Sequence, residues 1–133
     1  RQEAEAGIAH IERQCADHAD KLQAYTGYWL GCIGDATKGY CVCALLATQM
    51  PALPQEVALE VRAHFRALSA WLTSVLERGA TQGSFQLASD PRSEAETFMA
   101  TVHGAMLSAR AYGDPEMFGL ITRPLIEKLI VQP

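Results

Sequence analysis

The side chains best suited to chemistry in this 133-residue chain are its four cysteines and four histidines. The cysteines are Cys15, Cys32, Cys41 and Cys43, and their spacings match no small disulfide scaffold, so we expect reduced, buried thiols. Cys41 and Cys43 lie in a segment with a helical pattern, where positions two apart point about 200° away from each other, which disfavours a disulfide or a shared metal ion. The alternative is a redox or electrophile sensor acting through Cys32, Cys41 or Cys43, although apolar surroundings disfavour the reactive thiolate.

The histidines are His10, His18, His64 and His103, and they follow neither C-x-x-C nor H-x-x-x-H spacing. We therefore expect no metal ion and no cofactor. An enzyme built on a helical bundle would need a Glu-x-x-His pair or a glycine-rich phosphate loop, and the sequence offers neither. An enzyme is accordingly the weakest of the alternatives, and we expect none.

Composition and charge restrict the class of protein. With 49% hydrophobic and 20% charged residues, the chain is ordinary globular protein, and its length suits one domain over residues 1–133. The net charge is −4 and no basic stripe is present, so we expect no nucleic-acid binding by this chain alone. The sequence shows neither a membrane span nor a secretion signal, which predicts a cytoplasmic protein, and we expect a further segment before Arg1.

The spacing of apolar residues predicts an all-α domain. One stripe at alternating steps of four and three predicts a helix over residues 3–30, with room for a bend midway. The stripe consists of Ala4, Ile8, Ile11, Cys15, His18, Leu22, Tyr25 and Trp29. Residues 39–55 carry no charge and are apolar around the helical circumference, which predicts a central helix buried on all sides. The amide of Gln49 would then need a partner from the protein or from a ligand.

The next helix is predicted from Pro54 to Gly79, because a proline suits the first turn of a helix. Its apolar stripe consists of Val57, Val61, Phe65, Leu68, Leu72, Val75 and Leu76. Gly79 and Gly83 offer a left-handed stop, and residues 84–89 follow as a loop.

Two Asp-Pro pairs predict the last two helices, because the aspartate can cap free amides and the proline suits the first helical position. The first helix starts at Pro91 and ends before Gly113. The second starts at Pro115 and ends near residue 131, with a bend expected at Pro124.

The helix ending at Tyr112 has two uncharged faces. One face should pack on the core of the domain and consists of Ala95, Phe98, Met99, Val102, Ala105, Met106 and Ala109. The opposite face, where lysine and glutamate are expected, holds small and apolar residues instead: Thr97, Ala100, Thr101, Gly104, Leu107, Ser108 and Ala111. Charge is confined to a strip formed by Glu96, His103 and Arg110.

The last helix also spreads its apolar residues over more than one side. Two such helices exceed what one small domain can cover, so we expect a homodimer in which both helices pair with their copies as a four-helix bundle. From this helix the expected interface takes Phe118, Ile121, Leu125 and Leu129. The alternative is that other helices of the same chain cover both faces.

Three stretches in order resemble the C-terminal regulatory domain of TetR/AcrR-type transcriptional regulators: CVCALLATQMPALPQEV, F..L..WL..VLERGATQGSF and DP...A..FMATVHGAMLSARAYGDP. The resemblance covers residues 39–130 and the first helix only loosely. It implies an all-α domain that binds a small effector in a helical pocket and dimerises through its last two helices. It also implies a helix-turn-helix domain of about fifty residues before Arg1, through which operator DNA would be bound.

These observations together predict the effector-binding and dimerisation domain of a transcriptional repressor. Relatives often carry a glutamate where this chain has Gln49, so we expect a neutral or hydrophobic effector. A ligand among the first, central and Pro54–Gly79 helices would favour a dimer geometry unsuited to successive major grooves, and operator affinity would fall. The candidate effector-binding residues are Tyr25, Trp29, Cys43, Gln49, Phe65, Leu68, Trp71, Met99, His103 and Met106.

Overall fold

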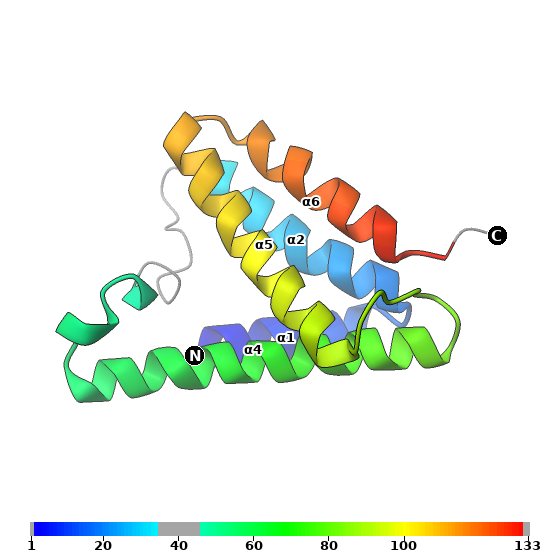
Figure 1. Ribbon diagram of the computed structural model, residues 1–133, viewed down its shortest axis with the longest axis horizontal. Helices are drawn as coiled ribbons and strands as arrows, with labels where there is room; N and C mark the ends of the chain where they lie inside the picture. The colour runs from blue at the N-terminus through cyan, green and yellow to red at the C-terminus, as the bar shows by residue number, and fades with distance from the viewer. Residues whose placement is uncertain (1, 35–45, 132–133) are drawn as a thin grey trace.

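The computed structural model describes residues 2–34 and 46–131, and it is all-α as predicted (Figure 1). Its elements are α1 (Gln2–Gln14), α2 (His18–Gly34), the short 3-10 helix η1 (Met50–Ala52), α4 (Gln55–Thr81), α5 (Pro91–Tyr112) and α6 (Glu116–Leu129). Within these two ranges the β-structure is a single bridge between Phe85 and Ile130. None of the described helices is both long and apolar enough to span a membrane.

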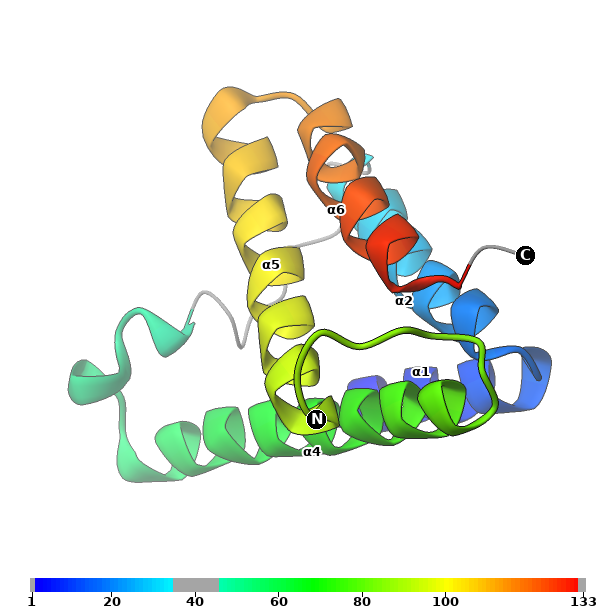
Figure 2. The ribbon, with the colours of Figure 1, turned by 45° about the vertical axis from the view of Figure 1, so that its right-hand side comes forward.

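The single helix predicted over residues 3–30 is in fact two helices that run in different directions (Figures 1 and 2). The break lies at Asp17, whose carboxylate accepts the backbone N–H of Ala19 at 2.8 Å and that of Asp20 at 3.2 Å. These two amides open α2 and have no partner inside the helix, so the aspartate caps a new helix start. The apolar stripe continues across the break, which is why spacing alone does not reveal it.

The central helix is predicted over residues 39–55, of which residues 39–45 lie outside the described residues. Its described end corrects one expectation: helical structure stops at Ala47, and Gln49 is exposed, not buried. Gln49 has φ −118° and ψ 16°, and its carbonyl accepts the N–H of Ala52 in the 3-10 turn that follows. The helix therefore ends before the two prolines: Pro51 lies within the 3-10 helix η1, and Pro54 is the residue directly before α4.

The later helices begin and end close to their predicted positions. Asp90 accepts the N–H of Ser93 at 3.1 Å, and Gly113 ends α5 in the left-handed region at φ 64°. Asp114 accepts the N–H of Glu116 at 3.0 Å at the start of α6. Helix α6 ends at Leu129, two residues earlier than predicted, because the chain there pairs with the 84–86 loop: Gln86 donates to the Leu129 carbonyl at 2.8 Å.

Helix α4 ends later than predicted. Gly79 does not stop the helix but lies inside it, buried, and the helix continues to Thr81. A Cβ placed on Gly79 would lie 2.2 Å from Cδ2 of Phe85, so the missing side chain is what lets the Phe85 ring pack on the helix. Gly83 does adopt the left-handed conformation, with φ 81°.

One core joins α2, α4, α5 and α6, with α4 lying across the base and α5 and α6 rising from it side by side (Figure 2). The largest fully buried side chains are Phe98, Phe118, Leu22, Leu72, Leu76, Val75 and Val102. All seven residues predicted for the core face of α5 are buried. The α5 stripe therefore packs as its periodicity predicts.

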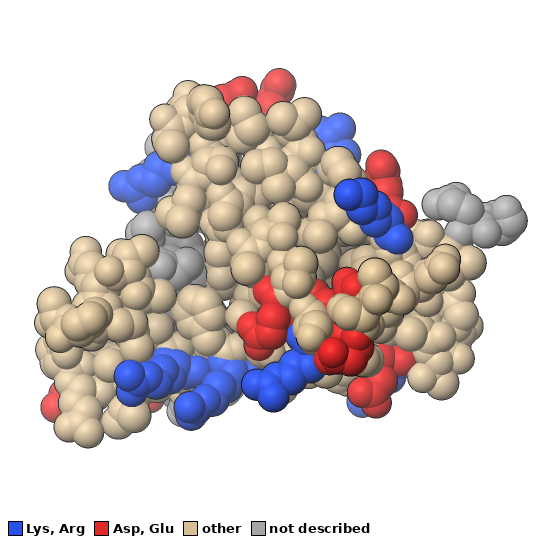
Figure 3. All heavy atoms as spheres, in the orientation of Figure 1, with Lys and Arg blue, Asp and Glu red and all other residues tan. Residues whose placement is uncertain are grey.

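The second face of α5 is left uncovered in this chain. Thr97, Ala100, Leu107 and Ala111 are exposed, and the other three residues predicted for this face, Thr101, Gly104 and Ser108, are half-buried. Figure 3, in which α5 lies toward the viewer, shows this side as largely free of charge. Other described helices of the chain therefore do not cover both faces of α5.

On α6 the predicted interface needs a correction. Phe118 and Leu129 are 1% and 6% exposed and pack in the chain's own core, so a partner molecule cannot reach their side chains. Ile121 and Leu125 are half-buried, while Leu120 is 65% exposed. The apolar surface of α6 is thus shifted around the helix from the predicted position, because Phe118, Thr122, Ile126 and Leu129 together form the side facing the core.

Candidate functional site

An aromatic cluster fills the junction of α2, α4 and α5. The Tyr25 ring lies edge-on to that of Trp71, with 5.7 Å between centroids, and 6.4 Å from that of Phe98. Trp29, one turn further along α2, meets Tyr25 edge-on at 6.4 Å. Edge-to-face pairs of this kind add to the free energy of burial and fix the ring orientations.

Two histidines extend the cluster along α4 and α5. His64 contacts the neighbouring Phe65 ring at 5.9 Å, and Phe65 lies 5.2 Å from the ring of His103 on α5. Both histidines are buried, and Phe65 is half-buried against the core. His103 shares one α5 stripe with Met99 and Met106, so that stripe presents an imidazole between two thioethers.

Two ring nitrogens of this cluster, Nε1 of Trp29 and Nε2 of His103, are buried without a hydrogen-bond partner. A buried donor or acceptor left unpaired costs about 1–3 kcal/mol. Trp71 offers the contrast, since its Nε1 donates to Oε1 of Glu12 at 2.8 Å. The cluster is therefore well packed in its rings but incomplete in its hydrogen bonds.

Burial also sets the protonation state of the histidines. Removal from water, reinforced by the nearby charge of His64, lowers the pKa of His103 to about 4. Burial likewise lowers the pKa of His64. His103 is therefore neutral at physiological pH, and its ring can donate or accept at Nε2 according to its tautomer.

A partly buried ion pair connects the cluster to α1. Lys21 on α2, with a side chain 7% exposed, donates to Oε2 of Glu12 at 2.7 Å. Partial burial raises the pKa of Glu12, but the hydrogen bonds from Lys21 and Trp71 outweigh that effect and hold it below its ordinary value. Glu12 thus links α1 to α2 and α4 at once.

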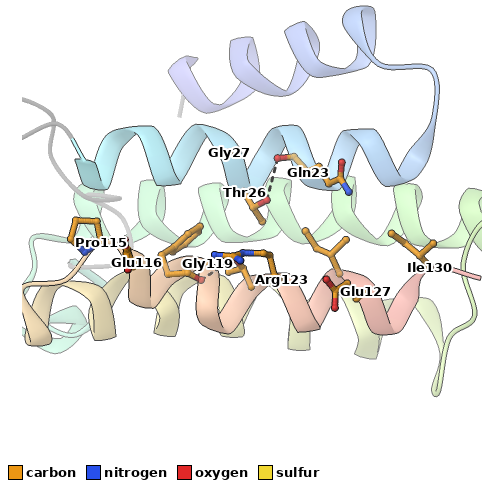
Figure 4. Close-up of a pocket in the computed structure, with 12 residues that line it drawn as sticks. Gln23, Thr26, Gly27, Pro115, Glu116, Gly119, Arg123, Glu127 and Ile130 are labelled. Atoms are coloured by element: carbon orange, nitrogen blue, oxygen red, sulfur yellow. Dashed lines mark hydrogen bonds between the residues drawn. The ribbon is translucent and has the colours of Figure 1, made fainter.

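A separate groove of about 580 Å³ runs between α2 and α6 (Figure 4). Its lining includes Thr26 and Thr122, which are buried, and the exposed Arg123. The hydroxyl of Thr26 donates to backbone carbonyls of its own helix, and that of Thr122 donates to the Phe118 carbonyl at 2.9 Å. These hydroxyls are hydrogen-bonded within their own helices, and none of the predicted effector-binding residues lines this groove.

The structure brings most of the predicted effector-binding residues together. Those buried in or packed against one core are Tyr25, Trp29, Phe65, Leu68, Trp71, Met99 and Met106, with His103 touching Phe65. Cys43 lies outside the described residues. Gln49 became a candidate because its amide was expected to be buried, and the structure shows it exposed. Sequence reasoning missed Glu12 and Lys21, because their ion pair joins two helices that the apolar stripe merged into one, and the hydrogen bond from Trp71 to Glu12 joins residues 59 positions apart.

The described residues hold no group of three or more His, Cys, Asp or Glu side chains suited to a metal ion. Cys15, half-buried, is a free thiol. The site is therefore built from rings, two unpartnered nitrogens and one ion pair.

Comparison with known proteins identifies the family to which this all-α domain belongs. Residues 19–125 match the family described as "Tetracyclin repressor-like, C-terminal domain". The structure superposes with a TM-score of 0.95 on a TetR-family transcriptional regulator from Agrobacterium tumefaciens, at 62% sequence identity over 98% of this chain and 68% of that chain. The chain belongs to the TetR family of transcriptional regulators. TetR-family proteins are regulators, not enzymes, and they act as dimers that bind DNA and small effectors.

Two solved structures of lower sequence identity share the fold. Escherichia coli NemR in its reduced form matches at 15% identity and a TM-score of 0.80, covering 98% of this chain and 67% of that chain. A TetR regulator from Legionella pneumophila matches at 19% identity and 0.81, covering 96% and 67%. No curated protein matches the chain.

Proposed function

We propose that this chain is the effector-binding and dimerisation domain of a repressor that leaves its operator when a small, uncharged and largely hydrophobic molecule binds. The observation that carries this proposal is the aromatic cluster of α2, α4 and α5, which is linked to α1 through Glu12. As part of a transcriptional regulator the domain would act in the cytoplasm, and operator DNA would be bound by a helix-turn-helix domain joined to α1.

The route of the signal follows from the contacts of Trp71. One side of its ring meets Tyr25 in the cluster, and its N–H holds Glu12 of α1. A ligand that displaces Tyr25 shifts Trp71, and the hydrogen bond carries that shift to α1. Such coupling requires that the ligand favour one of two arrangements, so its affinity for the two must differ.

The second half of the proposal is the dimer. We propose that the exposed uncharged face of α5, together with the exposed side of α6 around Leu120, pairs with the same surface of a second copy. Small residues such as Ala100 and Gly104 let two helices approach closely, and a two-fold interface uses the same patch on both partners.

The test of this function uses the full-length regulator and an effector found by thermal-shift screening of uncharged aromatic compounds against this domain. We expect the effector to raise the unfolding temperature and to weaken operator binding at least ten-fold. Trp71→Phe should retain effector binding while reducing its effect on operator affinity. An effector that binds tightly and leaves operator affinity unchanged would contradict the proposal.

A further inference from the structure

The two unpartnered nitrogens of the aromatic cluster specify what the effector must carry. Trp29 Nε1 is a donor only, so its missing partner is an acceptor. His103 Nε2 belongs to a ring only 8% exposed, and its missing partner is a second polar atom. His18 Nδ1 is also unpartnered, but it lies at the opposite end of α2 from Trp29, and its ring is held through Nε2 by Gln82 at 3.1 Å.

We propose that the effector is an uncharged aromatic molecule whose hydrogen-bond acceptor, such as a carbonyl oxygen, receives the N–H of Trp29, while a second polar atom faces Nε2 of His103. This inference rests on the proposed effector-binding function and adds the chemical class of the ligand. It makes Trp29 the residue that determines specificity.

The aromatic character of the ligand follows from the rings next to the two nitrogens. Trp29 is bordered by the rings of Tyr25 at 6.4 Å and Tyr28 at 5.0 Å, and His103 by that of Phe65 at 5.2 Å. An aromatic ligand can make edge and face contacts with such rings. The absence of charge follows from the same contacts, because these ring neighbours supply no counter-ion, and the ion pair of Glu12 and Lys21 is already complete.

The groove between α2 and α6 is a poorer site for the same molecule. Its buried hydroxyls, on Thr26 and Thr122, already donate to carbonyls of their own helices. A ligand bound there would leave Trp29 and His103 unchanged. The inference therefore predicts that substitutions of Trp29 and His103 change ligand affinity and that substitutions in the groove do not.

The experiment compares two probes of the same shape, 2-acetylnaphthalene and 2-ethylnaphthalene, of which only the first has an acceptor. Dissociation constants are measured by calorimetry for the native protein and for Trp29→Phe, which keeps a flat ring but removes the N–H. We expect the native protein to bind the ketone at least ten-fold more tightly than the hydrocarbon. Trp29→Phe should reduce that ratio to within two-fold.

Tyr112→Phe is the control, because the Tyr112 ring is 72% exposed at the end of α5 and lies outside the aromatic cluster. We expect it to keep the ten-fold preference for the ketone. A third probe, 6-hydroxy-2-acetylnaphthalene, adds a second polar group, and the affinity gained from its hydroxyl should be lost in His103→Phe.

Equal affinity of the native protein for the ketone and the hydrocarbon would overturn the inference. A preference for the ketone that Trp29→Phe leaves unchanged would also overturn it, because the acceptor would then not be bound by the N–H of Trp29. Failure of all three probes to bind would overturn the ligand class. If another small molecule binds and releases the operator with an affinity that Trp29→Phe leaves unchanged, this inference fails while the proposed function stands. If nothing in a broad library binds, both fail.

Discussion

At the scale of single residues, the two tryptophans differ in one hydrogen bond, and that difference is the main argument for a ligand-binding site. Trp71 Nε1 has Glu12 as its acceptor, whereas Trp29 Nε1 has none. A native protein keeps few such buried unpaired groups, and each carries a free-energy cost unless another molecule supplies the partner. The cluster therefore resembles a site prepared for a ligand more than a finished core.

The first prediction compares the stability of two matched variants without ligand. Trp71→Phe leaves Glu12 without its N–H donor and should lower the free energy of unfolding by about 1–2 kcal/mol. Trp29→Phe removes a donor that has no partner and should leave that free energy unchanged or slightly higher. Urea unfolding followed by circular dichroism measures both. A larger loss for Trp29→Phe than for Trp71→Phe would show that Trp29 is an ordinary satisfied core residue.

The second prediction concerns pH. The pKa of His103 is about 4 in the folded protein and near 6.5 when unfolded, so the unfolded chain binds the extra proton first as pH falls. The stabilising contribution of the neutral ring is complete above about pH 6.5 and is lost between 6.5 and 4, at most about 3 kcal/mol. His103→Phe should flatten this part of the stability curve. The stability of the variant should still fall in acid, because protonation of Glu12 breaks its ion pair. That loss occurs at lower pH, since the pKa of Glu12 is held below its ordinary value.

At the scale of elements, helix ends were predictable and helix continuity was not. Asp90 and Gly113 are local signals whose caps form as expected, because each acts through its own backbone neighbours. The break at Asp17 was missed because the apolar stripe runs through it. Gly79 was misread as a helix stop because its real function, contact with Phe85, depends on a loop that returns from six residues away.

The third prediction tests that contact. Gly79→Ala places a methyl group against the ring of Phe85 and should destabilise the fold by about 1–3 kcal/mol. Gly27→Ala is the control, since α2 leaves open space there, and it should raise stability by about 0.5–1 kcal/mol through helix propensity. Thermal unfolding compares the two. Equal effects would mean that Phe85 moves aside without cost.

At the scale of the whole molecule, the all-α architecture and the two-faced α5 were predictable from periodicity, because a helix shows its buried side in its own sequence. Which residues of α6 are exposed was not, because the side of α6 that faces the core depends on how the helix packs against α5 and α2, and that packing buries Phe118 and Leu129. The same holds for the cluster: its rings could be named as candidates, but the connection from Trp71 to Glu12 needed the fold.

The fourth prediction concerns the uncovered face. Leu107 on α5 is 42% exposed and Leu59 on α4 is 54% exposed, yet only Leu107 belongs to the proposed interface. Leu107→Glu places two charges against each other across a two-fold axis and should convert the dimer to folded monomers. Leu59→Glu carries the same change and should remain dimeric.

Dimerisation through the uncovered face of α5 is tested most directly by sedimentation equilibrium of this chain and of these two variants at micromolar concentration. We expect a dimer for the native chain and for Leu59→Glu, and a monomer with an unchanged circular dichroism spectrum for Leu107→Glu. A native chain that sediments as a folded monomer, or a Leu107→Glu variant that remains fully dimeric, would contradict the account.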